Sequence, residues 1–376
     1  GGAALLEHYH TSRWIARHEI FTCMMEFDNW YNPDTVGRGT NTCAPLAISQ
    51  LIKYYKHPYK GSSNIPSYTY TTHWEQDPNS QIQSNIYYKN TAPLINHQSQ
   101  IYDYDIMPFK SGSWGIDGGF GLNPNPNPIK PPSCTPEFDI FYPYCDDGTI
   151  TNREDAPTMS QMGEVIFNVG CSVKMNWFRG GTDNLPRKFG NAMSNYFNYN
   201  FNPSDAITIS PTLSPSLFKQ KIRASLLNER PVIFSGYTMP GGGGHTFLVD
   251  GFQCDNFFHV ALGIGGEHDG YYYLFLADSI GNYNQLAYEY HQDATVELHP
   301  NCNLVPDITI NNKTYTSQEL EQAQNNITAS NTTVQTGAKT FMIGGNSVEL
   351  TSNVEVVLGA ELFINIETCG VPKQGN

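Results

Sequence analysis

Hydrophobic residues recur at helical spacing in several segments of the chain. In residues 44–55 the apolar positions fall on one face of a helix, and the His57-Pro58 pair ends the run. Residues 1–60 are accordingly expected to form helical pieces around a turn-rich link. Further helices are predicted for residues 158 to about 169, with Thr158 as N-cap, and for residues 185–197 and 214–227.

Short apolar runs follow the last of these helices and predict the strands of one sheet. Gly, Asn, Asp and Pro residues lie between the runs, as expected for strands joined by turns. Helices first and an antiparallel sheet afterwards predict an α+β fold. The predicted strands are residues 232–234, 246–249, 257–261 and 271–276.

Residues 105–157 have no regular hydrophobic repeat. They contain Gly118-Gly119, alternating Asn and Pro at 123–128, and Pro131-Pro132, which exclude a regular core element. The segment is predicted to be a long loop inserted into the α+β part. Its acidic residues at 146–155 could hold Ca²⁺ through hard oxygens, but they lack the EF-hand spacing, and an acidic solvated loop is the more common interpretation.

The composition changes after Cys302. Aromatic residues become rare, and Thr, Asn, Val and Ile alternate in short runs punctuated by Gly344-Gly345 and Gly359. Short, evenly spaced strands predict a small all-β module, stacked or solenoid-like, at residues 304–376. The chain is therefore expected to have two domains, residues 1–303 and residues 304–376.

Composition and charge exclude several classes of function. The chain has 376 residues and a formal net charge of −14, so binding to the phosphate backbone of nucleic acids is disfavoured. No apolar run is long enough to span a membrane, and no N-terminal signal peptide is visible. The start at Gly1 without Met fits a processed form. Lys and Arg are scarce while Asn, Tyr, Ser, Thr and Gly are abundant, which fits a secreted protein.

The eight cysteines do not have the spacing of a metal site. No CxxC pair occurs, so a zinc ribbon is disfavoured, and neither a metal nor a cofactor is expected. Cys134 and Cys145 flank a Pro- and Tyr-rich loop and are predicted to pair, as are Cys302 and Cys369. The alternative is that all the cysteines are buried free thiols, although secretion favours disulfides.

Two segments far apart in the sequence carry candidate chemistry. Cys43 lies at the start of the first predicted helix, and His245 follows four glycines at the start of a predicted strand. A helix N-terminus and a nearby imidazolium both favour a thiolate, and the first N–H groups of the helix can stabilise an oxyanion. Each residue alone is more often structural, but their order, on a helix and then on a sheet, fits a nucleophile and its general base. The pattern predicts hydrolysis of peptide bonds by a Cys43–His245 dyad.

Four segments carry a resemblance to a known family. They are Asn41-Thr42-Cys43-Ala44 with the helix after it, then residues 159–173, 230–251 and 256–272. In these segments the chain resembles the streptopain-like, C10-type cysteine peptidases, which belong to the papain-like structural class. The resemblance covers about residues 20–300, apart from the predicted insertion, and implies a papain-like fold with Cys43 as nucleophile and His245 as general base. It also implies secretion and polypeptide substrates.

The chain departs from the pattern of that family in two features. The family has an Asn-Trp pair shortly after the His-Val of the later strand, and this Asn holds the catalytic imidazole. This chain has Ala261-Leu262 there, and Ile264 in place of a second Trp.

The family also has a Gln upstream of the Cys that helps to form the oxyanion hole, but no Gln precedes Gln50 here and the corresponding stretch begins at Phe27. Losing one oxyanion donor typically costs about 100- to 1,000-fold in rate. A replacement amide could come from Asn29, Asn32 or Asn41.

Two hypotheses about function remain open on the sequence. One is a secreted cysteine endopeptidase, favoured by Cys43 and His245. The other is a catalytically degenerate relative that acts as an extracellular binding, surface or assembly component, favoured by Phe27 and the Ala261-Leu262 pair. The C-terminal module is similar to the short β-stack modules that close many secreted bacterial proteins, which implies a cell-surface or assembly partner rather than chemistry.

Overall fold

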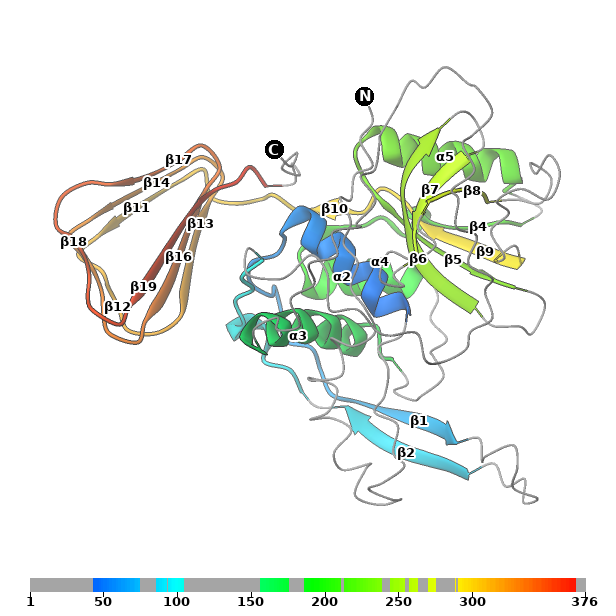
Figure 1. Cartoon of the computed structure of the whole chain (residues 1–376), viewed down its shortest axis with the longest axis horizontal. Coiled ribbons are helices and arrows are strands. Elements are labelled where there is room, and N and C mark those ends of the chain that lie inside the picture. The colour runs from blue at the N-terminus through cyan, green and yellow to red at the C-terminus, as the bar shows by residue number, and fades with distance from the viewer. Residues whose placement is uncertain are drawn as a thin grey trace, which may run out of the picture.

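The chain combines a helix-covered antiparallel sheet with a stack of parallel strands at its C-terminal end (Figure 1). The computed structural model describes residues 43–74, 86–92, 94–104, 156–175, 186–210, 213–238, 244–253, 257–262, 270–274, 288 and 290–369. Several predictions fall outside the described residues. They are the helical pieces before residue 43, the inserted loop up to residue 155, its acidic site, and the Cys134–Cys145 pair.

The antiparallel sheet has six strands in the order β4-β9-β5-β6-β7-β8, and every neighbouring pair is antiparallel. This confirms the predicted antiparallel sheet, although β4 and β9 were not predicted because their short runs carry polar residues. The strand predicted at residues 246–249 is longer than expected. The bounds are β4 Ala206–Thr208, β5 Val232–Tyr237, β6 Gly244–Gln253, β7 Phe257–Ala261, β8 Gly270–Tyr273 and β9 Tyr290–Thr295.

The helices lie close to their predicted positions. They are α2 Cys43–Tyr55, α3 Ala156–Ser172, α4 Pro186–Tyr196 and α5 Pro215–Leu227. The Ser214 side chain accepts a hydrogen bond from the Leu217 N–H and caps α5. The prediction that Thr158 caps α3 is wrong, because the helix already begins at Ala156. Pro157 fits into that first turn, where its missing N–H has no intrahelical partner to lose.

The sheet is covered by α2 on one face and by α5 on the other. Along β6 the side chains alternate between the two faces. Leu248 lies in one core cluster with Ile48 and Leu51 of α2, whereas Phe247 lies in a second cluster with Phe218 of α5. Every residue of α2 from Ala44 to Tyr55 is buried, so this helix is a core element rather than a surface helix.

Two smaller pairs of strands complete the first part of the chain. Strands β1 Tyr68–Trp74 and β2 Ile86–Ala92 form an antiparallel pair, and β3 Tyr199–Asn200 pairs with β10 His299–Pro300. Neither pair was predicted, because the sequence around them is polar with weak periodicity. Short 3₁₀ turns occur at His97–Ser99 and Pro203–Asp205.

Residues 307–366 form short strands that stack into three parallel sheets, in the orders β11-β14-β17, β12-β15-β18 and β13-β16-β19. Each circuit of the chain adds one strand to every sheet, and apolar residues of successive strands fill the centre. Side-chain amides also stack, because Asn353 donates to Asn331 at 2.9 Å and Asn331 to Asn311 at 3.0 Å. The bounds are β11 Asp307–Asn311, β12 Thr314–Tyr315, β13 Glu319–Ala323, β14 Asn326–Ser330, β15 Thr332–Val334, β16 Lys339–Gly344, β17 Ser347–Leu350, β18 Val354–Val356 and β19 Glu361–Ile366.

The C-terminal strands are anchored to the residues that follow α2. The predicted Cys302–Cys369 disulfide is confirmed, and it joins the two ends of the strand stack. Close to it, the Glu367 carboxylate forms an ion pair with Lys56 at 3.1 Å and accepts a hydrogen bond from the Tyr59 hydroxyl. The stack is therefore held at its base by a covalent bond and by polar contacts.

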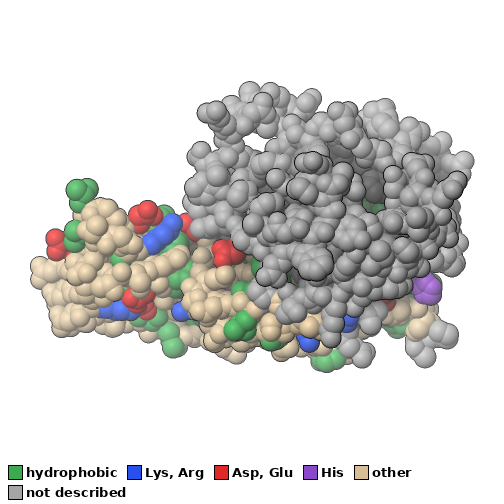
Figure 2. Space-filling view, turned by 90° about the horizontal axis from the view of Figure 1, so that it is seen from below, with side chains coloured by type: hydrophobic (Ala, Val, Ile, Leu, Met, Phe, Trp, Pro, Cys, Tyr) green, Lys and Arg blue, Asp and Glu red, His purple; other side chains and the backbone are tan. Residues whose placement is uncertain are grey.

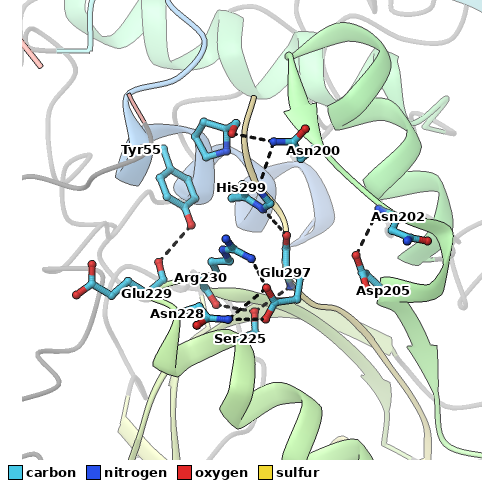
Figure 3. A network of polar contacts seen from close by, with 11 residues as sticks. Tyr55, Asn200, Asn202, Asp205, Ser225, Asn228, Glu229, Arg230, Glu297 and His299 are labelled. Carbon is cyan, nitrogen blue, oxygen red and sulfur yellow. Dashed lines mark hydrogen bonds and ion pairs between the residues drawn. The ribbon is translucent and has the colours of Figure 1, made fainter. Parts of the chain in front are cut away.

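A polar cavity of about 460 Å³ lies beside this disulfide. Figure 3 shows the network next to it, in which Tyr55 donates to the Glu229 carbonyl oxygen at 3.2 Å and Arg230 pairs with Glu297. Tyr55 ends α2 and Cys43 begins it, so the cavity is separated from Cys43 by about 20 Å of helix. Its polar groups bind one another and form a structural junction.

Acid is expected to destabilise the fold because of two buried histidines. Burial lowers the pKa of both His57 and His97 to about 4. The unfolded chain then binds more protons than the folded one between about pH 6.5 and pH 4, so stability present above pH 6.5 is lost as the pH falls through this window. We expect a loss of up to about 3 kcal/mol for each histidine, measured by urea unfolding at pH 7, 5 and 4. A His57→Gln, His97→Gln variant with the same pH dependence as the parent would contradict this account.

Candidate active site

Cys43 occupies the first position of α2, at the end of the helix where backbone N–H groups lack intrahelical partners. It is a free thiol, and the residue is partly exposed to solvent. Its side chain makes hydrogen-bonding contacts with His245 and with Thr246. The structure thus brings together the two residues, far apart in the sequence, that were predicted to form a dyad.

His245 is the second residue of β6 and lies opposite Gly236 of β5. Its Nε2 atom is 2.9 Å from the backbone carbonyl oxygen of Leu262. The ring also packs against the rings of Phe247 and Tyr288, with centroid distances of 5.8 Å and 5.2 Å. On the side away from Cys43, the imidazole is therefore held by the bond to Leu262 and by two aromatic contacts.

The bond to Leu262 determines which ring nitrogen of His245 carries the proton. A backbone carbonyl oxygen can only accept, so Nε2 of the neutral ring is the donor. Nδ1 is then unprotonated and can accept a proton from the thiol of Cys43. This is the tautomer that a general base needs.

The environment of Cys43 favours the thiolate. Burial raises the pKa of the Cys43 thiol, but the hydrogen bond and charge of His245 and the hydrogen bonds from Thr246 lower it further than burial raises it. The net result is a pKa below the ordinary value for cysteine. A lowered pKa makes a cysteine more nucleophilic at neutral pH because more of it is ionised.

Sequence reasoning missed two features of this site. Ala261 and Leu262 were interpreted as the loss of an orienting Asn and of the Trp beside it, yet the backbone carbonyl of Leu262 binds the imidazole. Backbone groups leave no mark in a sequence, so no pattern could have revealed this contact. Thr246 was assigned only to a strand, although a hydroxyl residue directly after a candidate base was a usable signal.

Other residues that the sequence analysis considered for this site lie outside the described residues. Asn29, Asn32, Asn41 and Ile264 all fall there, so no replacement for the missing Gln is identified. Among the residues that the structure describes, no group of three or more His, Cys, Asp or Glu side chains could hold a metal ion. No helix among them is long and apolar enough to cross a membrane.

Gly236 is expected to be essential for the position of the His245 ring. A Cβ atom at residue 236 would lie 2.5 Å from the backbone oxygen of Tyr288, whose ring packs on His245. Gly236→Ala should therefore displace Tyr288 and lower kcat/KM for peptide hydrolysis by about 100-fold, the usual effect of a misplacement near 1 Å. Gly344→Ala is the matched control, because its Cβ would meet a backbone oxygen at 2.2 Å in the C-terminal strands. Equal losses of activity in both variants would argue against a specific role of Gly236.

Comparison with known proteins finds that the chain is similar to a family of peptidases. Residues 143–272 match the model of the Peptidase C10 family. Streptopain of Streptococcus pyogenes is 25% identical over 237 residues, which are 62% of this chain and 45% of that protein. The thiol protease/hemagglutinin PrtT of Porphyromonas gingivalis is 29% identical over 276 residues, 71% of this chain and 25% of that protein. The chain thus spans less than half the length of these relatives.

A solved structure also aligns with the chain. Active wild-type interpain A cysteine protease of Prevotella intermedia matches 77% of this chain and 92% of its own, at 15% identity and a TM-score of 0.47. His245 lies inside the segment matched by the family model, whereas Cys43 precedes it. By the family match and the sequence similarity to named cysteine peptidases, the chain is identified as a homologue of the C10-type, streptopain-like cysteine peptidases.

Proposed function

We propose that the protein is a cysteine endopeptidase of papain-like fold, with Cys43 as nucleophile and His245 as general base. The observation that carries the proposal is the contact between the Cys43 thiol, at the start of α2, and an imidazole whose far nitrogen is bound by the Leu262 carbonyl. The sequence similarity to streptopain and to a thiol protease supports the same chemistry. Polypeptides are the substrates that this chemistry implies.

The reaction begins with transfer of the thiol proton of Cys43 to Nδ1 of His245. The sulfur then attacks the carbonyl carbon of the peptide bond, and backbone N–H groups at the start of α2, including that of Cys43, stabilise the oxyanion. His245 gives its proton to the leaving amine as the C–N bond breaks. Water, deprotonated by His245, finally hydrolyses the thioester and restores the thiol.

The Leu262 carbonyl takes over the task that an orienting side chain performs in the resembled family. It fixes the tautomer of His245, limits rotation of the ring, and accepts a hydrogen bond from the imidazolium that forms during the reaction. The replacements at Ala261 and Leu262 therefore do not leave the imidazole unsupported. This weakens the case for a catalytically degenerate protein.

Labelling with an epoxide-type thiol inhibitor tests the proposed peptidase. We expect peptide mass spectrometry to find the label on Cys43 of the folded protein at neutral pH, and to find slow labelling of the His245→Ala variant. The buried Cys171 is an internal control, since it should stay unlabelled. No label on Cys43, with the thiol shown to be reduced, would support the degenerate alternative instead.

We further propose that residues 1–303 form the peptidase domain and that residues 304–376 form a separate all-β module of a secreted protein. The Cys302–Cys369 disulfide supports an extracellular location, because disulfides persist in oxidising compartments. Mass spectrometry of the culture medium and of the cell extract tests this. Intact protein found only in the extract would contradict secretion.

The last circuit of the C-terminal stack is the proposed contact surface for an extracellular partner. Figure 2 shows hydrophobic side chains protruding among polar ones on one face of the C-terminal stack. Leu358 is 94% exposed, and strands β17, β18 and β19 lie at the edges of their sheets. Edge strands with exposed apolar side chains can pair with another chain. We expect Leu358→Asp with Ile364→Asp to weaken retention by cell-surface fractions without changing hydrolysis of short peptides, and equal retention would contradict the surface.

A further inference from the structure

The site contains two buried hydroxyl groups that the mechanism above does not use. They belong to Thr246 of β6 and Ser235 of β5, and each residue is only 8% exposed. Their oxygens are 2.9 Å apart, and the two residues are directly opposite each other in the pairing of β5 with β6. The pair is therefore fixed by the register of the sheet.

The face of the sheet on which Thr246 lies directs its hydroxyl toward α2. Side chains two residues apart on a strand share a face, so Thr246 shares that of Leu248, which packs in the cluster of α2. Ser235 shares the face of Ile233, which belongs to the same cluster. Both hydroxyls thus lie under the helix that begins with Cys43, and Thr246 contacts the sulfur with its backbone N–H and its side chain.

The thiolate state gives these hydrogen bonds one direction. A thiolate has no proton and can only accept, so the Thr246 hydroxyl must donate to the sulfur. The Thr246 oxygen is then left to accept from the Ser235 hydroxyl. No bond is formed or broken in either residue, because the thiol proton goes to His245.

We propose that Thr246 is a third catalytic side chain of this site, which donates a hydrogen bond to the Cys43 thiolate, and that Ser235 is the positioning residue that orients its hydroxyl. This inference rests on the proposed peptidase function and deepens it. Hydrogen bonds to an ionised group are about twice as strong as neutral ones, and a chain of them is strengthened further in a buried site. The pair would thus hold the thiolate without adding a charge.

His245 is the one charged group among the described residues that acts on Cys43, so the effects of Thr246 can be separated from other electrostatic terms. Thr246→Val removes the hydroxyl while it preserves the shape of the side chain and the backbone N–H. Thr246→Ser keeps a hydroxyl and is the conservative rescue. Ser235→Ala removes the orienting group and leaves Thr246 in place.

The test is the pH profile of Cys43 alkylation by iodoacetamide, followed by peptide mass spectrometry. A hydrogen bond to a charged group changes a pKa by roughly one to two pH units. We expect the midpoint for Thr246→Val to rise by about one pH unit or more relative to the parent. Ser235→Ala should shift it in the same direction by less, and Thr246→Ser should restore the parental midpoint.

Two further outcomes separate this inference from the proposed function. A parent midpoint well below that of an ordinary thiol, unchanged in both Thr246→Val and Ser235→Ala, would overturn the role of the hydroxyl pair and leave the peptidase intact. An ordinary midpoint in the parent would overturn both. If Thr246→Val does not fold, the presence or absence of a shift in Ser235→Ala decides.

Discussion

Cys43→Ala is expected to abolish peptide hydrolysis, with kcat falling by at least about 10⁴-fold. The sulfur is the only atom of the site that forms a covalent bond with substrate in the proposed mechanism, and removing such a nucleophile costs nearly the whole chemical rate enhancement. Initial rates with a fluorogenic peptide measure the loss. Substrate affinity should change little, because binding relies on the rest of the cleft.

Cys171→Ala provides the matched control for this loss. Cys171 is also a cysteine outside any disulfide, but it is buried in α3 and belongs to the hydrophobic core. Its replacement should lower thermal stability slightly while kcat stays within about twofold of the parent. Activity of Cys43→Ala within about tenfold of the parent would exclude Cys43 as the nucleophile.

His245→Ala is the second large effect, with kcat expected to fall by about 10³-fold or more. The variant lacks both the acceptor of the thiol proton and the charge that favours the thiolate, so two contributions to the rate are lost together. Alkylation of Cys43 near neutral pH should slow as well, because a smaller fraction of the thiol is ionised. Steady-state kinetics and the alkylation rate measure these two effects separately.

His299→Gln is the control for the effect of replacing a histidine outside the candidate active site. His299 lies in the polar junction near the disulfide, where its ring contacts Asn200 and the Glu297 carbonyl oxygen (Figure 3). This variant should keep parental kinetics. If His245→Ala retained a normal rate of hydrolysis while His299→Gln did not, the assignment of the base would be wrong.

Much of the fold was predictable because its elements follow local rules. The helical repeat of α2, the Ser214 cap of α5 and the apolar runs of β5 to β7 are local signals, and the structure agrees with all of them. The start of α3 was misplaced by two residues, since Thr158 is a good cap by type but Pro157 favours an earlier first turn. Strands β4 and β9 were missed because their burial comes from neighbouring strands rather than from their own composition.

In the candidate site, too, features with a local sequence signal were predictable, whereas contacts between distant segments were not. Cys43 and His245 could be chosen from the sequence because each follows a recognisable local pattern, a helix start and a glycine run before a strand. The hydrogen bond between His245 and the Leu262 carbonyl could not be predicted. Any residue supplies a carbonyl, and only the path of β7 decides where that carbonyl points.

By itself the sequence determined the types of most elements, the disulfide at the base of the C-terminal strands, and the choice of Cys43 and His245 as candidate nucleophile and base. The tertiary structure alone decided how that chemistry is assembled. It sets Thr246 opposite Ser235, turns both toward α2, and brings a backbone carbonyl to the far side of the imidazole. The physical reason is that hydrogen bonds between distant strands depend on register and on chain path, which no short stretch of sequence encodes.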